Sequence, residues 1–138
     1  MELVIDANEV FSMIIAQGKG RQTKKLDILF SDQVYLYAPA LLFMELEKSK
    51  EDIKAKARFN DSDFEVFIEI LRLRIKVAGI EEYSEYIEQA RKICPDKKDT
   101  LYFALALKRK CILWSGDKAL RKQSLVKVIN TKELLELL

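Results

Sequence analysis

The sequence predicts an α/β fold in which helices cover both faces of a parallel sheet. Segments with strand character alternate with helical segments along the chain, which is the order that gives parallel strands joined by helical crossovers. The strand segments, such as ELVID at 2–6 and CILWS at 111–115, are short and continuously apolar. Strands that alternate apolar and polar residues have one face exposed to solvent. The continuously apolar pattern instead indicates strands that are buried on both faces.

The first half of the chain contains two of the expected strands. The strand at 2–6 ends in an aspartate, and we expect a helix over about 7–17 to follow it, closed by Gly18 and Gly20. A second helix is expected over roughly 22–31. The strand at 34–39 stops at Pro39, which can begin a helix over about 39–49.

The second half repeats this alternation after a densely charged stretch at 48–63. A strongly amphipathic helix is expected over 63–74, with Asp61 or Ser62 as its cap. Its apolar face carries Phe64, Phe67, Ile68 and Leu71, which suits either the core or a dimer interface. The further expected elements are strands at 75–79, 111–115 and 126–129 and helices at 83–93, 97–109 and 131–138.

The composition indicates one globular domain, residues 1–138, with 49% hydrophobic and 33% charged residues. No apolar run approaches the roughly 20 residues that span a bilayer. The first residues also lack the features of a signal peptide. We therefore expect a cytoplasmic protein that has no contact with membranes.

Histidine is absent from the chain, and this excludes whole classes of chemistry. Ser-His-Asp and Cys-His catalysis and histidine-ligated metals all require it. Cys94 and Cys111 have no partners with which to form a zinc site, so we expect free thiols, or a disulfide if the source is a hyperthermophile. Catalysis would have to rest on other groups, and carboxylates prefer hard ions such as Mg²⁺ and Mn²⁺.

Several acids fall where the strands of a parallel sheet would end. Asp6 closes the first strand, Asp117 follows CILWSG, and Asp96 and Asp99 open the helix that leads into that strand. Glu45 interrupts an otherwise apolar helix, LLFMEL. Ligands of open parallel sheets bind outside the carboxyl ends of the strands, so these acids are candidates for a metal site.

Each acid also has an explanation that involves no ligand. Asp6, Asp96 and Asp117 can be helix N-caps, and Asp99 can be the acidic partner of a capping box. Glu45 alone can be a solvated helix residue. Capping does not explain why so many acids gather at one end of the sheet, where they would repel one another unless a cation neutralised them.

Four motifs in order resemble the landmarks of PIN domains. They are VIDAN at 4–8, the acid in LLFMELEK, PDKKDTLYFALAL at 95–107 and LWSGD at 113–117. The resemblance covers the chain from residue 3 to about 130. It implies a three-layer α/β/α sandwich with a central, mostly parallel sheet of four to five strands. It also implies hydrolysis of phosphodiester bonds, usually in RNA, with Mg²⁺ or Mn²⁺ as the cofactor.

The family's functional residues can be carried over position by position. The resemblance makes Asp6 the central ligand of one or two metals, with Glu45, Asp99 and Asp117 completing the catalytic site. Auxiliary positions match at Asn8, Ser115 and Asp96. The main departure is Gly116, where asparagine is common, and this could loosen the loop that carries Asp117.

The substrate and the partners are expected from the same resemblance and from local charge. Lys118, Arg121 and Lys122, together with Lys97 and Lys98, flank the site and could contact the phosphates of single-stranded RNA. Many compact PIN domains are the toxin of a VapC-type toxin–antitoxin pair, so a cognate antitoxin is a possible partner. A homodimer is expected from the apolar face at 64–71 and from the LLELL tail.

Two alternatives remain open at this point. One is a PIN-like module that binds RNA or protein without cutting. The other is a receiver-like signalling domain that binds Mg²⁺, although such a domain would want paired acids after the first strand, and here there is one.

Overall fold

The computed structural model describes residues 1–21 and 23–138 and is built on one five-stranded sheet. The order of the strands is β3-β2-β1-β4-β5, and every neighbouring pair is parallel. The strands are β1 (Glu2–Ile5), β2 (Tyr35–Pro39), β3 (Ile75–Ala78), β4 (Ile112–Trp114) and β5 (Val128–Ile129). The expected parallel sheet is confirmed, with β1 at its centre between β2 and β4.

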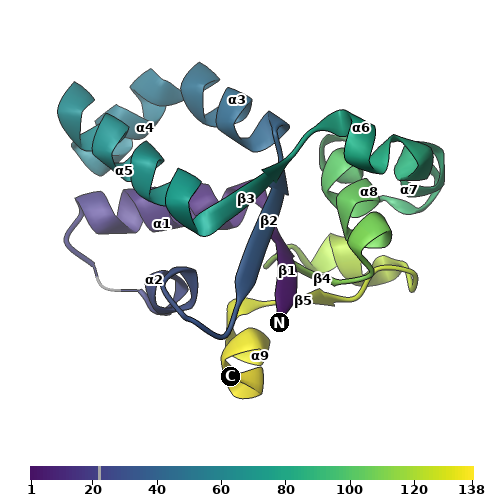
Figure 1. The fold of residues 1–138 in the computed structure, drawn as a ribbon. Coiled ribbons are helices and arrows are strands. Elements are labelled where there is room, and N and C mark those ends of the chain that lie inside the picture. The colour runs from purple at the N-terminus through teal and green to yellow at the C-terminus, as the bar shows by residue number, and fades with distance from the viewer. Residues whose placement is uncertain (22) are drawn as a thin grey trace.

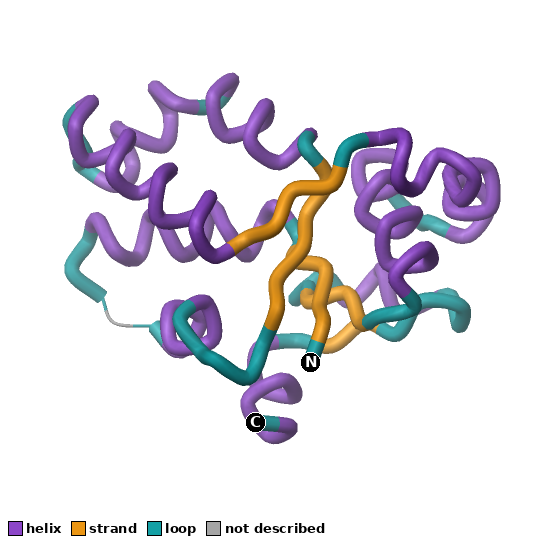
Figure 2. Tube along the Cα trace, viewed as in Figure 1, coloured by secondary structure: helices purple, strands orange, loops and turns teal. Residues whose placement is uncertain are grey.

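Helices cover both faces of the sheet and complete the expected α/β/α sandwich (Figures 1 and 2). Helices α1 to α5 lie on one side of the strands and α6 to α8 on the other, while α9 packs against α2. The helices of the first side are α1 (Ala7–Gly18), α2 (Lys24–Leu29), α3 (Leu41–Lys48), α4 (Lys50–Ala57) and α5 (Asp61–Arg74). The others are α6 (Ile80–Tyr83), α7 (Ile87–Ile93), α8 (Thr100–Arg109) and α9 (Thr131–Leu137), with 3₁₀ turns η1 (Ser84–Tyr86), η2 (Lys97–Asp99) and η3 (Lys118–Lys122).

The central strand explains why its sequence is continuously apolar. Leu3, Val4 and Ile5 have no exposed surface, because successive side chains of a strand point to opposite faces and a helical layer covers each face. Trp114 at the end of β4 is also fully buried, and its indole N–H donates to the Thr131 hydroxyl at 3.1 Å. The core therefore holds the carboxyl ends of β1 and β4 in fixed positions.

The strand order excludes the receiver-like alternative. Receiver-type domains have the order 2-1-3-4-5, in which the third strand lies between the first and the fourth. In this chain β1 pairs directly with β4, and β3 lies at the edge beside β2.

The charged stretch at 48–63, for which no element was expected, contains a helix. In α4, Ile53 and Ala57 are buried while the acids and lysines of the opposite face form exposed ion pairs such as Lys56–Asp52. The expected caps of the following helix, Asp61 and Ser62, are wrong. Asn60 caps α5 through a capping box with Asp63, with reciprocal bonds of 2.7 and 3.0 Å, so the helix begins at Asp61.

Other boundaries differ by small amounts from those expected. The helix expected over 22–31 is α2, Lys24–Leu29, and position 22 lies outside the described residues. The segments at 83–93 and 97–109 each include a 3₁₀ turn, and the strand at 126–129 pairs only at 128 and 129. Pro39 ends β2 and does not begin α3.

The apolar face of α5 belongs to the core. Phe64 and Leu71 are fully buried, and Phe67 and Ile68 are at most 8% exposed. This face therefore gives no reason to expect a dimer, and the expectation rests only on the LLELL tail, where Leu137 and Leu138 are exposed.

Cys94 and Cys111 are free and only half-buried. Within residues 1–21 and 23–138, no helix combines the length and apolar character that a membrane crossing requires.

Candidate metal centre

Asp6 is the structural centre of the acidic site. Its backbone N–H donates to the Trp114 carbonyl at 3.0 Å, which continues the β1–β4 pairing and places Asp6 beside the end of β4. Its carboxylate is almost fully buried and accepts from the Ser115 hydroxyl at 2.7 Å and from the Asn8 backbone N–H at 3.4 Å. Burial raises the pKa of Asp6 and the two hydrogen bonds oppose that rise, while the charges of Glu9 and Asp117 add to it.

Ser115 joins Asp6 to Asp117. Its hydroxyl donates to Asp6 and accepts from the Asp117 backbone N–H at 3.1 Å. The Asp117 carboxylate accepts in turn from the Ala119 N–H at 2.9 Å, which caps η3. A single buried hydroxyl thus fixes the first and last acids relative to each other.

Asp96 and Asp99 come from the turn that leads into α8. Asp96 caps η2 by accepting from the Lys98 N–H at 3.0 Å. Asp99 stands at the N-cap position of α8 but makes no side-chain capping bond, so the capping-box role considered for it is wrong. Burial, followed by the charges of Asp6, Asp96, Asp117 and Glu45, raises the pKa of Asp99 to about 7.

Glu45 reaches the same place from the opposite layer of helices. The hydroxyl of Tyr102, on α8, donates to its carboxylate at 3.2 Å. Burial raises the pKa of Glu45, the charge of Asp6 adds to the rise, and Lys98 opposes it. The acid inside the LLFMEL helix is therefore part of the acidic cluster and not a solvated surface residue.

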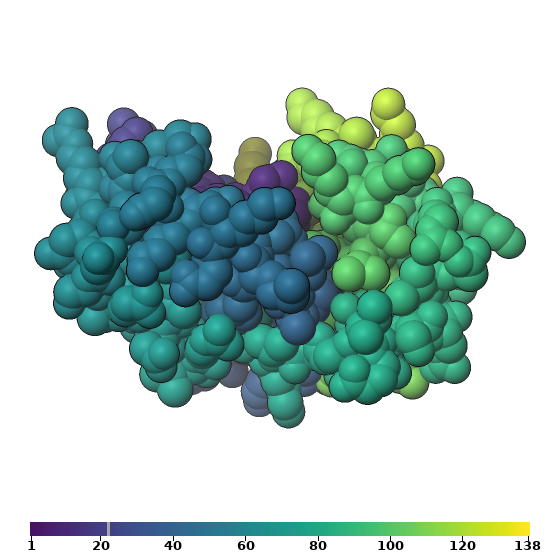
Figure 3. All heavy atoms as spheres, turned by 90° about the horizontal axis from the view of Figure 1, so that it is seen from above, coloured from purple at the N-terminus to yellow at the C-terminus, as the bar shows by residue number. Residues whose placement is uncertain are grey.

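These side chains surround one cavity of about 140 Å³ at the carboxyl ends of the strands. From this end the surface is hollowed between α3, in blue, and the green segment around α8, and purple N-terminal atoms show inside the hollow (Figure 3). The structure thus brings together all four expected acids as well as Asn8 and Asp96, with Ser115 bonded to Asp6. The lining residues are Asp6, Ala7, Asn8, Phe11, Glu45, Asp96, Lys98, Asp99, Tyr102 and Asp117.

The cavity fits a hard divalent cation by its donors and its charge. Carboxylate oxygens dominate its ionisable groups, and mutual repulsion together with burial raises the pKa of Asp6, Glu45 and Asp99. In the part of the chain that the structure describes, no three acidic side chains are close enough to form a complete ligand group. The carboxylates line the same cavity but do not contact one another, and a bound cation would reduce their electrostatic repulsion.

The basic residues expected to contact substrate do not line this cavity. Lys118, Arg121 and Lys122 form η3, directly after Asp117, but the Arg121 guanidinium pairs with Glu133 on α9. Arg121 is thus committed to a contact within the fold. Lys98 is the exception, because it was also expected to flank the site and its side chain does line the cavity.

Glu9 and Tyr102 are two site residues that sequence reasoning missed. Tyr102 lies in the apolar run LYFALAL, whose sequence predicts that its aromatic ring is a core residue. Glu9 is a buried acid that accepts from the Gly116 N–H at 2.9 Å and pairs with Lys25 at 2.8 Å. An acid placed among the apolar residues of ANEVF was the available signal, but an acid in the first turn of a helix is common for other reasons.

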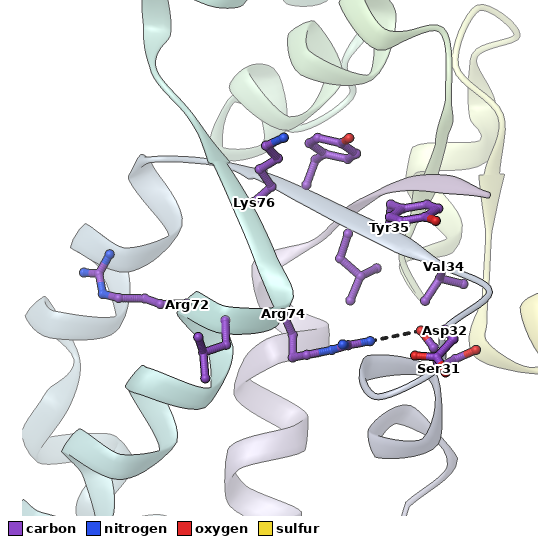
Figure 4. A pocket seen from close by; sticks show the side chains of 10 residues that line it. Ser31, Asp32, Val34, Tyr35, Arg72, Arg74 and Lys76 are labelled. Carbon is purple, nitrogen blue, oxygen red and sulfur yellow. Dashed lines mark hydrogen bonds between the residues drawn. The ribbon is translucent and has the colours of Figure 1, made fainter.

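A larger cavity lies elsewhere and has a different character (Figure 4). It measures about 520 Å³ beside β2 and β3, and it shares no lining residue with the acidic cavity. Arg72, Arg74 and Lys76 line it, and Arg74 donates to the carbonyl oxygens of Leu29 and Ser31 at 2.8 and 3.0 Å. Its one acidic lining residue, Asp32, cannot form a cation site by itself.

Comparison with known proteins connects the whole chain to one family. The family model described as PIN domain matches residues 4–137. The crystal structure of VapBC2 from Rickettsia felis, bound to a DNA fragment from its promoter, shares the fold with a TM-score of 0.68 at 13% sequence identity. That likeness covers 94% of this chain and 98% of the other. Among curated proteins, none is significantly similar in sequence.

Proposed function

The chain belongs to the PIN-domain family, and on that premise we propose that it is a divalent-metal-dependent endoribonuclease that hydrolyses RNA phosphodiester bonds. One observation carries the proposal. Four acids from four segments far apart in sequence line a single cavity at the carboxyl ends of the strands. We propose further that residues 1–138 act as one nuclease domain, since all the described strands belong to one sheet.

Within this proposal, Asp6, Glu45, Asp99 and Asp117 hold Mg²⁺ or Mn²⁺. A divalent cation held there would supply a nucleophile from water at neutral pH and would stabilise the charge that develops on the phosphate, so histidine would not be required. Ser115 keeps Asp6 and Asp117 in register, and Asn8 and Asp96 flank the ligands.

The substrate proposed is single-stranded RNA. Lys98 lines the cavity, and Lys118 and Lys122 follow Asp117 on η3, so the three can place phosphates beside the acids. Arg121, which is paired with Glu133, contributes less. Phosphate contacts of this kind position a strand without reading its sequence.

We also propose that the chain acts in the cytoplasm as the toxin of a toxin–antitoxin pair. The support is the fold that it shares with the VapBC2 complex, which is bound to a DNA fragment from its promoter. A cognate antitoxin would then be its protein partner. A homodimer remains part of this proposal, with the exposed Leu73 and Leu137 as its apolar contacts.

Cleavage of labelled single-stranded RNA tests the proposed activity. We expect cutting in Mn²⁺ or Mg²⁺, none in EDTA, and products with 5′-phosphate ends. Asp99→Asn and Asp117→Asn should each lower kcat by roughly 10²-fold or more, as loss of comparable electrostatic groups does elsewhere. Asp32→Asn removes an acid from the other cavity and is the matched control, with unchanged kcat.

Binding measured in EDTA separates RNA recognition from chemistry. Replacing Lys118 and Lys122 by Gln should weaken binding and reduce its salt dependence by about one unit of slope per lost phosphate contact, whereas Arg121→Gln should change it less. Unchanged binding in the double variant would show that the RNA takes another path. RNA binding without metal-dependent cleavage of any substrate would instead favour a non-catalytic PIN module.

A further inference from the structure

We propose that Glu9 is a positioning residue. From helix α1 it fixes the conformation of the loop that carries Asp117. Glu9 lies in the first turn of α1 and is 5% exposed. Its Oε1 accepts from the backbone N–H of Gly116 at 2.9 Å, and Gly116 directly precedes Asp117. The two residues are 107 positions apart in sequence, so the contact joins the start of the chain to the loop after β4.

Lys25 of α2 holds the other oxygen of this carboxylate. Its Nζ forms an ion pair with Oε2 of Glu9 at 2.8 Å, without hydrogen-bond geometry, and donates a hydrogen bond to the Ser12 hydroxyl at 3.1 Å. The side chains of Glu9 and Lys25 are only 6% and 24% exposed, so solvent screens the pair weakly. The two carboxylate oxygens of Glu9 therefore contact different segments. One accepts from the loop at Gly116, and the other pairs with Lys25 of α2.

The missing side chain of Gly116 leaves room for the Glu9 carboxylate. A Cβ added at position 116 would lie 3.2 Å from Glu9 Oε1, tighter than an ordinary contact. A side chain at Gly116 would thus press on the oxygen that accepts the loop N–H. The absence of a side chain lets the carboxylate approach the backbone, and the hydrogen bond holds a loop that glycine would otherwise leave loose.

Asp117 is consequently restrained both at its own backbone N–H and at the residue before it. Its own N–H is bonded to Ser115, and the preceding N–H is bonded to Glu9. Groups that orient metal ligands without touching the metal typically cost 10–100-fold in metal affinity when they are removed. The effect on metal binding rests on the proposed function, whereas the effect on loop order does not.

Two substitutions of Glu9 test the positioning role. Glu9→Leu removes the acceptor, and we expect Mn²⁺ to bind at least about tenfold more weakly by calorimetry. Glu9→Gln keeps an acceptor for Gly116, and Mn²⁺ affinity should stay within about threefold of wild type. Gly116→Ala disturbs the same bond with the carboxylate intact and should also weaken Mn²⁺ binding.

The second readout needs no metal. Amide hydrogen exchange followed by NMR in EDTA should be at least about tenfold faster at Gly116 in Glu9→Leu than in wild type, because the donor loses its partner. Thr131→Val is the control, since it removes the nearby Trp114–Thr131 hydrogen bond without touching the loop. Exchange at Gly116 and Mn²⁺ affinity should both remain as in wild type in this variant.

The outcomes separate this proposal from the nuclease proposal. Unchanged exchange at Gly116 in Glu9→Leu, or a loss of Mn²⁺ affinity equal to that of Thr131→Val, would overturn the role of Glu9. If wild type binds no Mn²⁺, the proposed function fails, and exchange at Gly116 still decides whether Glu9 holds the loop.

A double-mutant cycle tests the task of Lys25. Lys25→Met leaves the buried Glu9 charge without its partner and should lower Tm clearly more than Lys108→Met, which breaks an exposed pair with Glu85. In the Glu9→Gln background the same Lys25→Met change should cost much less, since no charge is left to neutralise. Equal costs in the two backgrounds would show that Lys25 does not serve Glu9.

Discussion

Three aspartates of the acidic site act as helix caps and as cavity residues at the same time. Asp6, Asp96 and Asp117 each accept the N–H of the residue two positions later, and all three line the cavity. The two explanations therefore do not compete, because a carboxylate has about four acceptor positions and capping uses only one of them. Asp99 differs, since it makes no capping bond and its pKa rises furthest among the carboxylates.

The pKa of Asp99 predicts how the metal-free protein responds to pH. Between the ordinary value of 3.8 and about 7, folded Asp99 keeps a proton that the unfolded chain releases. The folded state then binds more protons, so this group makes stability fall as pH rises through that window and adds no further change above it. Tm measured in EDTA from pH 4 to 8 should therefore fall less in Asp99→Asn than in wild type. Parallel curves for the two proteins would contradict the raised pKa, and Asp32→Asn should follow wild type.

At the scale of elements, a hydrogen bond joins α3 to α8 at the cavity. Tyr102 is buried, and its hydroxyl donates to Glu45, which lies 57 positions earlier. Each of the two helices thus helps to place a side chain of the other. The orientation of Glu45 depends on this contact and not on α3 alone.

Tyr102→Phe should remove the hydrogen bond that orients the Glu45 carboxylate, with little change in packing. We expect unfolding to cost about 1 kcal/mol less, the usual net value of one hydrogen bond, and Mn²⁺ to bind more weakly. Urea denaturation and calorimetry measure the two effects. Tyr35→Phe, at an exposed tyrosine outside the cavity, is the control. Full Mn²⁺ affinity in Tyr102→Phe would show that Glu45 needs no help from α8.

The packing of α1 against α4 depends on a single missing side chain. A Cβ on Gly18 would lie 1.9 Å from the backbone oxygen of Ala57, so the two helices must separate to accept it. Gly18→Ala should destabilise the fold by about 1–3 kcal/mol or more, as overpacking does. Gly20→Ala meets no atom within 4 Å and is strained only by its φ of 71°, so its cost should be smaller. Urea midpoints in the reverse order would contradict the close approach.

At the scale of the whole molecule, the sheet concentrates negative charge at one end. The chain carries a net charge of +2, yet five acids share one cavity with a single lysine. The repulsion between these acids is unfavourable, and the packing of the core offsets it because it holds the ends of β1 and β4 together. A ligand that binds only the native state and neutralises these acids should stabilise the fold.

Mn²⁺ should therefore raise Tm in a thermal melt, by the equivalent of about 2.7 kcal/mol at one hundred times its Kd. Asp6→Asn should abolish the rise and leave the metal-free protein as stable or more so, because it removes a buried, repelled charge. A clear loss of metal-free stability in Asp6→Asn would mean that capping is the main role of Asp6. Asp32→Asn should keep the full rise.

Local sequence determined the layers of the fold and the parallel direction of its strands. Strands buried on both faces must be continuously apolar, and helical crossovers keep them parallel, so the end at which Asp6 and Asp117 gather followed from connectivity. The charge on Glu45 was visible because it interrupts an apolar run. These features depend on a few neighbouring residues, which is the range over which sequence patterns carry information.

Tertiary structure alone decided which of the remaining side chains serve the site. In sequence, Tyr102 looks like any core aromatic, Arg121 like a free cation, and Glu9 like a first-turn acid. Their partners lie far away along the chain, at Glu45, Glu133 and Gly116. Helical periodicity shows which face of an element is apolar, but it does not show what packs there. For the same reason the apolar face of α5 suited a dimer as well as a core until its burial was known.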